Sequence, residues 1–231
     1  MTVKQILAEL KSLGTVQTRK TFARHGITGD YYGVRYGDLE KLAKRLKRER
    51  ESALAAGLWE SGNHDAMVLA TKIADPASLT KRQAEAWVRD VKNRLEVCAI
   101  AALVGQMEFA PDLADKWITA SPARSEWKVI SGWTLIADIA MNQKQHADVK
   151  VAWFRGHLKT IQSEIHEAIN WVRYEMNGAL IAIGSRNEAL RKSAEAAANR
   201  IGKVDVDHGD TSCKTPDAIP YLEKVWARKK K

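Results

Sequence analysis

Apolar residues recur at intervals of three and four along nearly the whole chain, which is the spacing of one face of an α-helix. The first stripe runs through Val3, Ile6, Leu7, Leu10 and Leu13 and stops at Gly14. Further stripes are Leu39, Leu42, Ala43 and Leu46, with Asp38 as the predicted N-cap; Met67, Ala70 and Ala74; Val97, Ile100, Ala101 and Val104; Val129, Trp133, Ile136 and Ala140; and Ile169, Val172, Met176, Ala179, Leu180 and Ile183. The alternation typical of a strand is confined to one short run, 203–207.

Short breakers such as Ser61-Gly62-Asn63, Asp75-Pro76 and Ser121-Pro122 separate these stripes. They predict an all-α protein of roughly a dozen helices joined by tight loops. Two architectures fit, a closed bundle and a solenoid of helical hairpins. The spacing of helix pairs, roughly 35 to 45 residues, favours a HEAT-like helical-hairpin solenoid, an α-α superhelix that forms a single domain over 1–231.

The end of the chain, 203–231, differs from what precedes it. Its polar run predicts an irregular connector, followed by a docked C-terminal helix with Pro216 in the first turn and basic residues at the end. The connector carries Asp205, Asp207, His208, Asp210 and Cys213. Neither an EF-hand arrangement nor a second pair of zinc ligands is present, so a polar turn without metal is the preferred interpretation.

Composition narrows the function further. The chain has 37 Lys and Arg against 28 Asp and Glu, a net charge of +9 that favours a polyanionic partner, whether nucleic acid or another anionic surface. An apolar content of 45 % excludes disorder, and no run is long enough to span a membrane. Two cysteines cannot make a disulfide framework, which predicts a cytoplasmic protein.

Basic residues cluster in two places. The first cluster lies on the helix expected around 38–46 and comprises Arg35, Lys41, Lys44, Arg45, Lys47, Arg48 and Arg50. The second flanks Trp87 and comprises Lys81, Arg82, Arg89, Lys92 and Arg94. Both clusters are candidate phosphate contacts, and the alternative is an ordinary solvated helix face.

A third candidate surface lies on the helix around Trp171. Asn170, Arg173 and Asn177 form a polar row beside the apolar stripe, with Trp171 at its edge. A tryptophan beside Arg and Asn suits a DNA-facing surface. The alternative is a tryptophan that packs between helices at the margin of the core.

Several segments together resemble the AlkD-type DNA alkylation repair superfamily. They are Gly33-Val34-Arg35 followed by Asp38-Leu39-Glu40-Lys41-Leu42-Ala43-Lys44, the helix with Trp127, the run Ala168-Ile169-Asn170-Trp171, and the tail from Val206 to Asp217. The likeness covers almost the whole chain. It implies a HEAT-like solenoid whose basic concave face holds duplex DNA. It also implies kinship with glycosylases that excise N3- and N7-alkylated purines without flipping the base into a pocket.

In that superfamily an Asp stabilises the sugar cation, two Trp pack on the deoxyribose and an Arg holds the phosphate. Here Arg94 takes the first Trp position, Cys98 the Asp position, Ile130 the Arg position, and only Trp171 matches. A neutral thiol cannot replace a carboxylate beside a developing cation, so excision is doubtful. Glu96, two residues before Cys98, points about 200° away around a helix.

The resulting hypothesis is a monomeric protein that needs no cofactor and binds duplex or branched DNA. Its candidate contacts are Arg89, Arg94, Trp127, Lys128, Trp171 and Arg173. Two alternatives stay open. One is an active glycosylase with a rearranged site that uses Glu96 or Glu126, and the other is a protein-interaction solenoid that binds an acidic partner.

Overall fold

The computed structural model describes residues 1–49 and 51–229. Every regular element in these ranges is helical, so the all-α prediction is confirmed. The helices form two compact units, Met1–Met107 and Glu108–Lys231. The prediction of one continuous domain over 1–231 stays a prediction.

The first unit is built around one buried helix. Its elements are α1 (Val3–Leu13), α2 (Val16–Arg24), α3 (Tyr36–Arg48), the 3-10 helix η1 (Glu51–Leu54), α4 (Ala55–Glu60), α5 (His64–Ile73), α6 (Lys81–Asp90) and α7 (Arg94–Val104). Helix α5 contacts α1, α3, α4 and α7, and nearly all of its side chains are buried. Asn63 caps its N-terminus by accepting a hydrogen bond from the amide of Ala66.

Two tryptophans support this core from α4 and α6. The rings of Trp59 and Trp87 stack almost in parallel, with their centroids 4.5 Å apart. The indole of Trp59 also donates a hydrogen bond to the carboxylate of Asp90. Trp87 is therefore a core residue. Its ring is not available to stack on a nucleic acid, although basic residues flank it.

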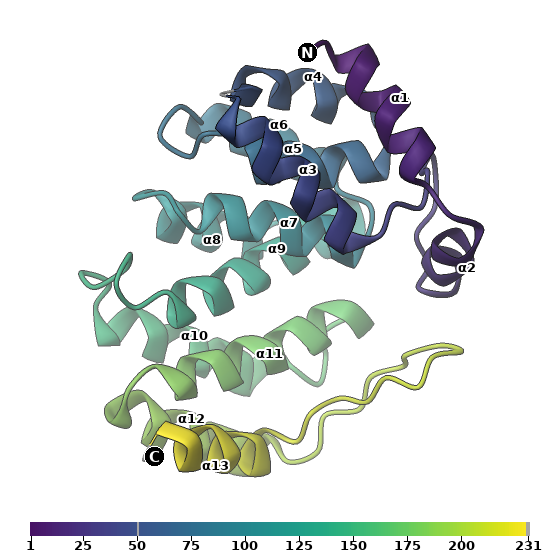
Figure 1. The fold of residues 1–231 in the computed structure, drawn as a ribbon. Coiled ribbons are helices and arrows are strands. Elements are labelled where there is room, and N and C mark those ends of the chain that lie inside the picture. The colour runs from purple at the N-terminus through teal and green to yellow at the C-terminus, as the bar shows by residue number, and fades with distance from the viewer. Residues whose placement is uncertain (50, 230–231) are drawn as a thin grey trace. The chain divides into compact units, whose positions relative to one another are not determined.

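The second unit is centred on α11 in the same way. Its helices are α8 (Ala110–Ile118), α9 (Pro122–Met141), α10 (Val151–Glu164), α11 (Asn170–Arg186), α12 (Glu188–Ile201) and α13 (Ala218–Lys229). Helix α11 packs against α9, α10, α12 and α13 (Figure 1). At its C-terminal end the buried guanidinium of Arg186 donates to the carbonyls of Ile139, Ala140 and His146. This arginine supplies partners for carbonyls that would otherwise be buried without one.

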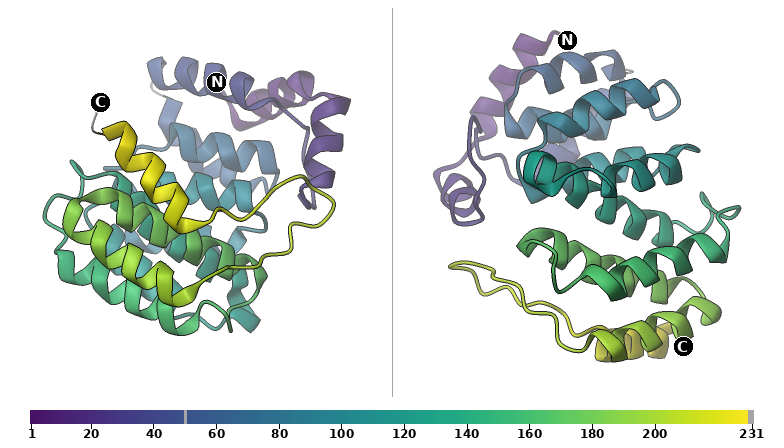
Figure 2. Two further views of the ribbon diagram at one scale, coloured as in Figure 1. Left: turned by 90° about the horizontal axis from the view of Figure 1, so that it is seen from below. Right: turned by 180° about the vertical axis from the view of Figure 1, so that it is seen from behind.

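The connector between α12 and α13 is irregular. It leaves α12 after Ile201, turns at Gly209 with a positive φ of 57°, and returns to α13, which lies beside α11 and α12 (Figure 2). In the described part of the chain, no three His, Cys, Asp or Glu side chains come together as potential metal ligands. None of the described helices has the length and apolar character needed to cross a bilayer.

The predicted helical stripes form the core, with three corrections at helix starts. Asp38 is not an N-cap, because α3 begins at Tyr36 and Asp38 lies in its first turn, where it pairs with Lys41. Ile169 precedes α11 and is 42 % exposed. The side chain of Arg173 binds the carbonyls of the turn before Ile169, and this turn is not helical. Pro216 lies outside α13. In the first turn of α13 the backbone amide of Ile219 donates a hydrogen bond to the carboxylate of Asp217.

Candidate nucleic-acid interface

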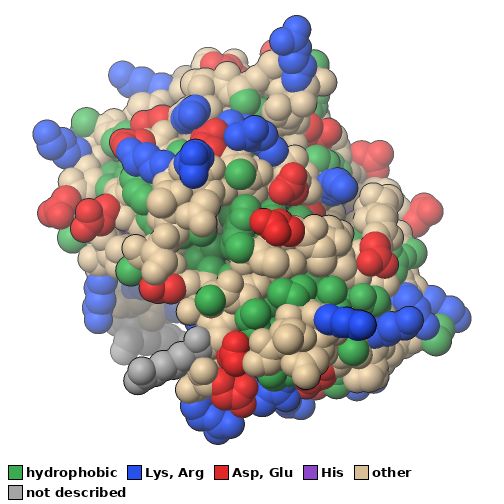
Figure 3. All heavy atoms as spheres, turned by 90° about the horizontal axis from the view of Figure 1, so that it is seen from above, with side chains coloured by type: hydrophobic (Ala, Val, Ile, Leu, Met, Phe, Trp, Pro, Cys, Tyr) green, Lys and Arg blue, Asp and Glu red, His purple; other side chains and the backbone are tan. Residues whose placement is uncertain are grey.

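The basic cluster on α3 divides into paired and exposed cations. Arg45 makes a bidentate ion pair with Glu9, with N···O distances of 2.9 and 2.6 Å. Lys41 pairs with Asp38 at 3.1 Å. Lys44, Lys47, Arg48 and Arg35 are exposed, and Arg50 lies outside the described residues. In the face drawn in Figure 3, lysine and arginine side chains form several groups with acidic side chains among them.

The predicted contacts on α6 and α7 lie at the surface of the first unit. Arg89 is exposed on α6, where its Nε donates to the carbonyl of Glu85 at 2.9 Å. Arg94 is the half-buried first residue of α7. Cys98 follows one turn later, exposed on the same helix. The structure thus places Arg94 and Cys98 on one helix face, as their spacing predicts.

Cys98 borders a cavity of about 720 Å³ that lies wholly within the first unit. Its walls come from α2, α3, α5 and α7, and most of the lining is apolar, including Leu39, Val68 and Leu103. Lys44, Lys47 and Lys72 contribute the basic part of the lining. The sequence gives no sign of this cavity, because its walls come from four helices separated along the chain.

Lys72 is tied into the wall of this cavity. Its ammonium group donates to the hydroxyl of Tyr36 at 2.8 Å and to the carboxylate of Glu40, and it lies 4.2 Å from the Tyr36 ring centroid. Burial opposes the charge on Lys72, but the hydrogen bonds to Glu40 and Tyr36 outweigh it and raise the pKa of Lys72. The hydrogen bond from Lys72 lowers the pKa of Glu40. Both groups are therefore charged at neutral pH, and Lys72 is already paired.

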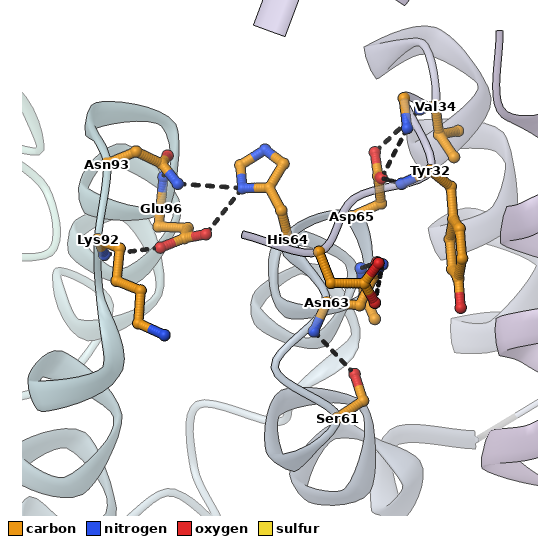
Figure 4. A network of polar contacts seen from close by, with 12 residues as sticks. Tyr32, Val34, Ser61, Asn63, His64, Asp65, Lys92, Asn93 and Glu96 are labelled. Carbon is orange, nitrogen blue, oxygen red and sulfur yellow. Dashed lines mark hydrogen bonds and ion pairs between the residues drawn. The ribbon is translucent and has the colours of Figure 1, made fainter. Parts of the chain in front are cut away.

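A polar network joins α7 to α5 through His64, which lines the cavity (Figure 4). One carboxylate oxygen of Glu96 lies 2.8 Å from His64 Nδ1, and the other accepts from the backbone amide of Lys92 at 2.8 Å. The amide of Glu96 donates to the side chain of Asn93, the N-cap of α7. Glu96 is 4 % exposed, and both of its oxygens are occupied within the protein.

The neighbouring residue, Asp65, holds the Gly33-Val34 motif. Its carboxylate accepts from the backbone amides of Tyr32, Gly33 and Val34 at 2.7, 3.0 and 2.9 Å (Figure 4). Gly33 has a φ of 79°, and an added Cβ there would lie 2.6 Å from the side chain of Arg19. The motif is thus a tight backbone loop that only glycine fits, closed by a buried acid.

The predicted contacts on α9 fall in the second unit. Trp127 and Lys128 are half-buried near the start of the helix, just after a break at Ser125, where φ is −152°. Ile130 is fully buried. The position that the resemblance gives to a phosphate-binding arginine is therefore occupied by a core residue here.

The polar row on α11 binds the chain's own connector. Asn170 exchanges two hydrogen bonds of 2.8 Å with the backbone of Asp207, and Asn177 donates to the carbonyl of Pro216 at 2.9 Å. Trp171 is half-buried and meets the ring of His208 edge to face, with centroids 5.9 Å apart. Asn170 and Asn177 thus anchor the segment between α12 and α13, and Trp171 lies where that segment crosses α11.

Arg173 is the strongest of these anchors. Its guanidinium donates to the carbonyls of Ile165, His166 and Ala168 in the turn before α11, and to the carbonyl of Asp205 in the connector. Four of its five N–H groups are engaged in this way. These bonds explain why the turn containing Ala168 is not helical and why Ile169 lies outside α11.

Replacing Arg173 with Gln is expected to loosen the connector. Glutamine cannot reach four carbonyls, so we expect a loss of about 2 kcal/mol in the free energy of unfolding and faster amide exchange across 203–217. Hydrogen-exchange mass spectrometry of that segment measures the effect. Arg155→Gln, an exposed change on α10, is the matched control. Unchanged exchange in the connector would contradict the anchoring role.

His64 and Asp65 were not found by reasoning from the sequence, although both are central to the geometry. Asn63 before an apolar helix signals an N-cap, and an acid in the first turn is common there. The local pattern therefore explains Asp65 fully as a helix-start residue. Its three bonds to the 32–34 loop span more than thirty positions, and no local pattern reports them.

Helices packed on helices in both units, with exposed cations on α3 and α6, define an all-α helical-repeat protein. The fold is similar, at a TM-score of 0.86, to a solved structure described as representing a new family of proteins related to the HEAT-like repeat DNA glycosylases, with affinity for branched DNA structures. The two sequences are 26 % identical, and the match covers 99 % of this chain and 95 % of the other. The HEAT-like fold prediction is confirmed.

The sequence model of the DNA alkylation repair enzyme family matches residues 6–222, and the chain belongs to that family. Among its relatives is an uncharacterised protein of Listeria innocua, 35 % identical with 99 % of each chain covered. Another is an uncharacterised protein of Listeria monocytogenes, 32 % identical over the whole of both chains. The resemblance seen in the sequence motifs is thus confirmed.

Proposed function

We propose that this protein binds branched DNA through its exposed cations and does not excise alkylated bases. The observation that carries the proposal is the end-to-end match to a protein whose family has affinity for branched DNA structures. The net charge of +9 supports it, because each phosphate contact releases counterions from the DNA. Branched DNA is therefore preferred to duplex DNA as the partner.

Three observations support the absence of excision. The residue at the expected position of the catalytic acid is Cys98, whose side chain bears no carboxylate. Glu96, a substitute acid considered from the sequence, is buried and bonded to His64 and to the amide of Lys92. Ile130, in the expected arginine position, is buried in the core. The other acid considered from the sequence as a substitute for the catalytic Asp is Glu126, which lies on α9.

Among the contacts proposed from the sequence, Arg89, Arg94, Trp127, Lys128 and Trp171 are retained as candidates. Each is at least partly accessible and lies on α6, α7, α9 or α11. Four N–H groups of Arg173 bind backbone carbonyls, so its main role in the proposal is to fix the connector near Trp171.

Fluorescence anisotropy with a labelled four-way junction and a linear duplex of equal length tests this proposal. We expect tighter binding to the junction and a loss of affinity of at least about 10-fold between 50 and 200 mM salt. Lys128→Gln should weaken binding to both DNAs and reduce the salt slope by about 1, whereas Lys144→Gln, exposed after α9, should not. Absence of DNA binding would contradict the proposal and favour an acidic protein partner.

A further inference from the structure

The cavity of the first unit has the size and chemistry of a small-molecule site. Its volume of about 720 Å³ lies within the range of roughly 300 to 1,000 Å³ typical of ligand pockets. Apolar side chains make most of the wall, and Tyr36 adds an aromatic ring that is 66 % exposed. A flat, largely apolar body would fill such a space and stack on the ring.

One polar atom in the cavity wall, Nε2 of His64, is available to bind a ligand. The side chain of His64 is 3 % exposed and lines the cavity, and Glu96 holds its Nδ1. Because a carboxylate only accepts hydrogen bonds, the proton between the two groups is assigned to Nδ1, and in that tautomer Nε2 is an acceptor. Nε2 forms no hydrogen bond with any residue in the described ranges, and it points away from both Glu96 and Asn93 in Figure 4.

The rim of the cavity is positively charged. Lys44 and Lys47 lie one turn apart on α3, line the cavity and are exposed. Lys47 has no hydrogen bond or ion pair with the residues described. Lys72, by contrast, is neutralised by Glu40. The cavity therefore combines an apolar interior, one inward acceptor and a cationic edge suited to a phosphate.

We propose that this cavity takes up one unpaired nucleotide of the bound DNA. The base lies against the apolar wall and Tyr36, an exocyclic amino group donates to His64 Nε2, and the adjoining phosphate lies at Lys44 and Lys47. This proposal rests on the proposed DNA binding and specifies the substrate class as DNA with an unpaired nucleotide at a bulge or branch. It differs from the non-flipping mode that the resemblance implies for excising relatives.

A duplex with a single bulged 2-aminopurine tests the proposal, because this base fluoresces weakly when stacked and carries the required amino group. Anisotropy of a distal dye reports DNA binding, and 2-aminopurine emission reports where the base lies. At saturation we expect a several-fold change in emission and about 10-fold tighter binding than to an abasic bulge. Saturated binding with unchanged emission and equal affinities would overturn the cavity proposal alone, whereas no anisotropy change would overturn DNA binding itself.

A matched pair of tryptophan substitutions locates the effect. Ala102 is exposed on α7 and lines the cavity, so Ala102→Trp fills the space with little disturbance of the core. Ala86 is exposed on α6 away from the cavity, so Ala86→Trp is the control. We expect Ala102→Trp to abolish the preference for the base-containing bulge while retaining binding to the abasic one. Equal preference in both variants would contradict binding of the base in this cavity. The surface substitutions Lys44→Gln and Lys47→Gln, made together, are a second test.

Discussion

Duplex DNA carrying N7-methylguanine or N3-methyladenine is expected to lose its alkylated base no faster with this protein than without it. The sugar cation that forms as the base departs needs a fixed negative charge nearby. Cys98 stands where the resemblance places that charge, and a cysteine side chain bears no carboxylate. Loss of one such preorganised group costs about 100- to 1,000-fold in rate.

Release of free base from each lesion, followed by chromatography at several protein concentrations, measures this rate. An alkylpurine glycosylase on the same DNA serves as the positive control, and anisotropy verifies that the protein is bound. Release in proportion to protein concentration would show that another acid serves. Glu126→Gln then tests the rearranged site, because the carboxylate of Glu96 is bonded to His64 and to the backbone amide of Lys92.

Local patterns predict most of this fold, because helix formation depends on spacing that the sequence displays directly. The stripes around Leu42 and Ile100 are buried as expected. The errors fall at helix starts. Before Asp38 the backbone is fixed by Asp65, which lies more than 30 positions away, so no local pattern shows this contact. Before α11 the backbone is fixed by the side chain of Arg173 in the first turn of the same helix, and the periodicity of apolar residues does not show this bond.

The candidate site is less predictable than the fold. The one-turn spacing of Arg94 and Cys98 predicts that they share a helix face. The cluster of basic residues predicts the exposed cations of α3. The cavity could not be predicted from the sequence, because Tyr36, His64 and Ala102 line one space only after four helices have packed. The polar row on α11 shows the complementary limit. Its periodicity correctly defines a face of the helix but does not reveal that the partner of that face is the chain's own connector.

The buried acid beside His64 makes the clearest link between the fold and the cavity. Asp65 is fully buried and accepts three backbone hydrogen bonds from 32–34, directly before α3. It thereby ties the helix that carries Tyr36, Lys44 and Lys47 to the helix that carries His64. Without these bonds, two walls of the cavity would lose their fixed relation.

Asp65→Asn is expected to lower the free energy of unfolding by about 3 kcal/mol. The amide retains one acceptor oxygen, but its NH2 group would face a backbone N–H, leaving buried donors without acceptors. Urea unfolding followed by fluorescence and circular dichroism measures the loss, and exchange of the amides of Tyr32, Gly33 and Val34 localises it. Asp38→Asn, which removes only a surface ion pair, should change stability by less than about 0.5 kcal/mol. If both variants were equally stable, the Asp65 bonds would not hold the loop, and the alignment of α3 with α5 would have to come from apolar packing between Leu39, Leu42 and the α5 face instead.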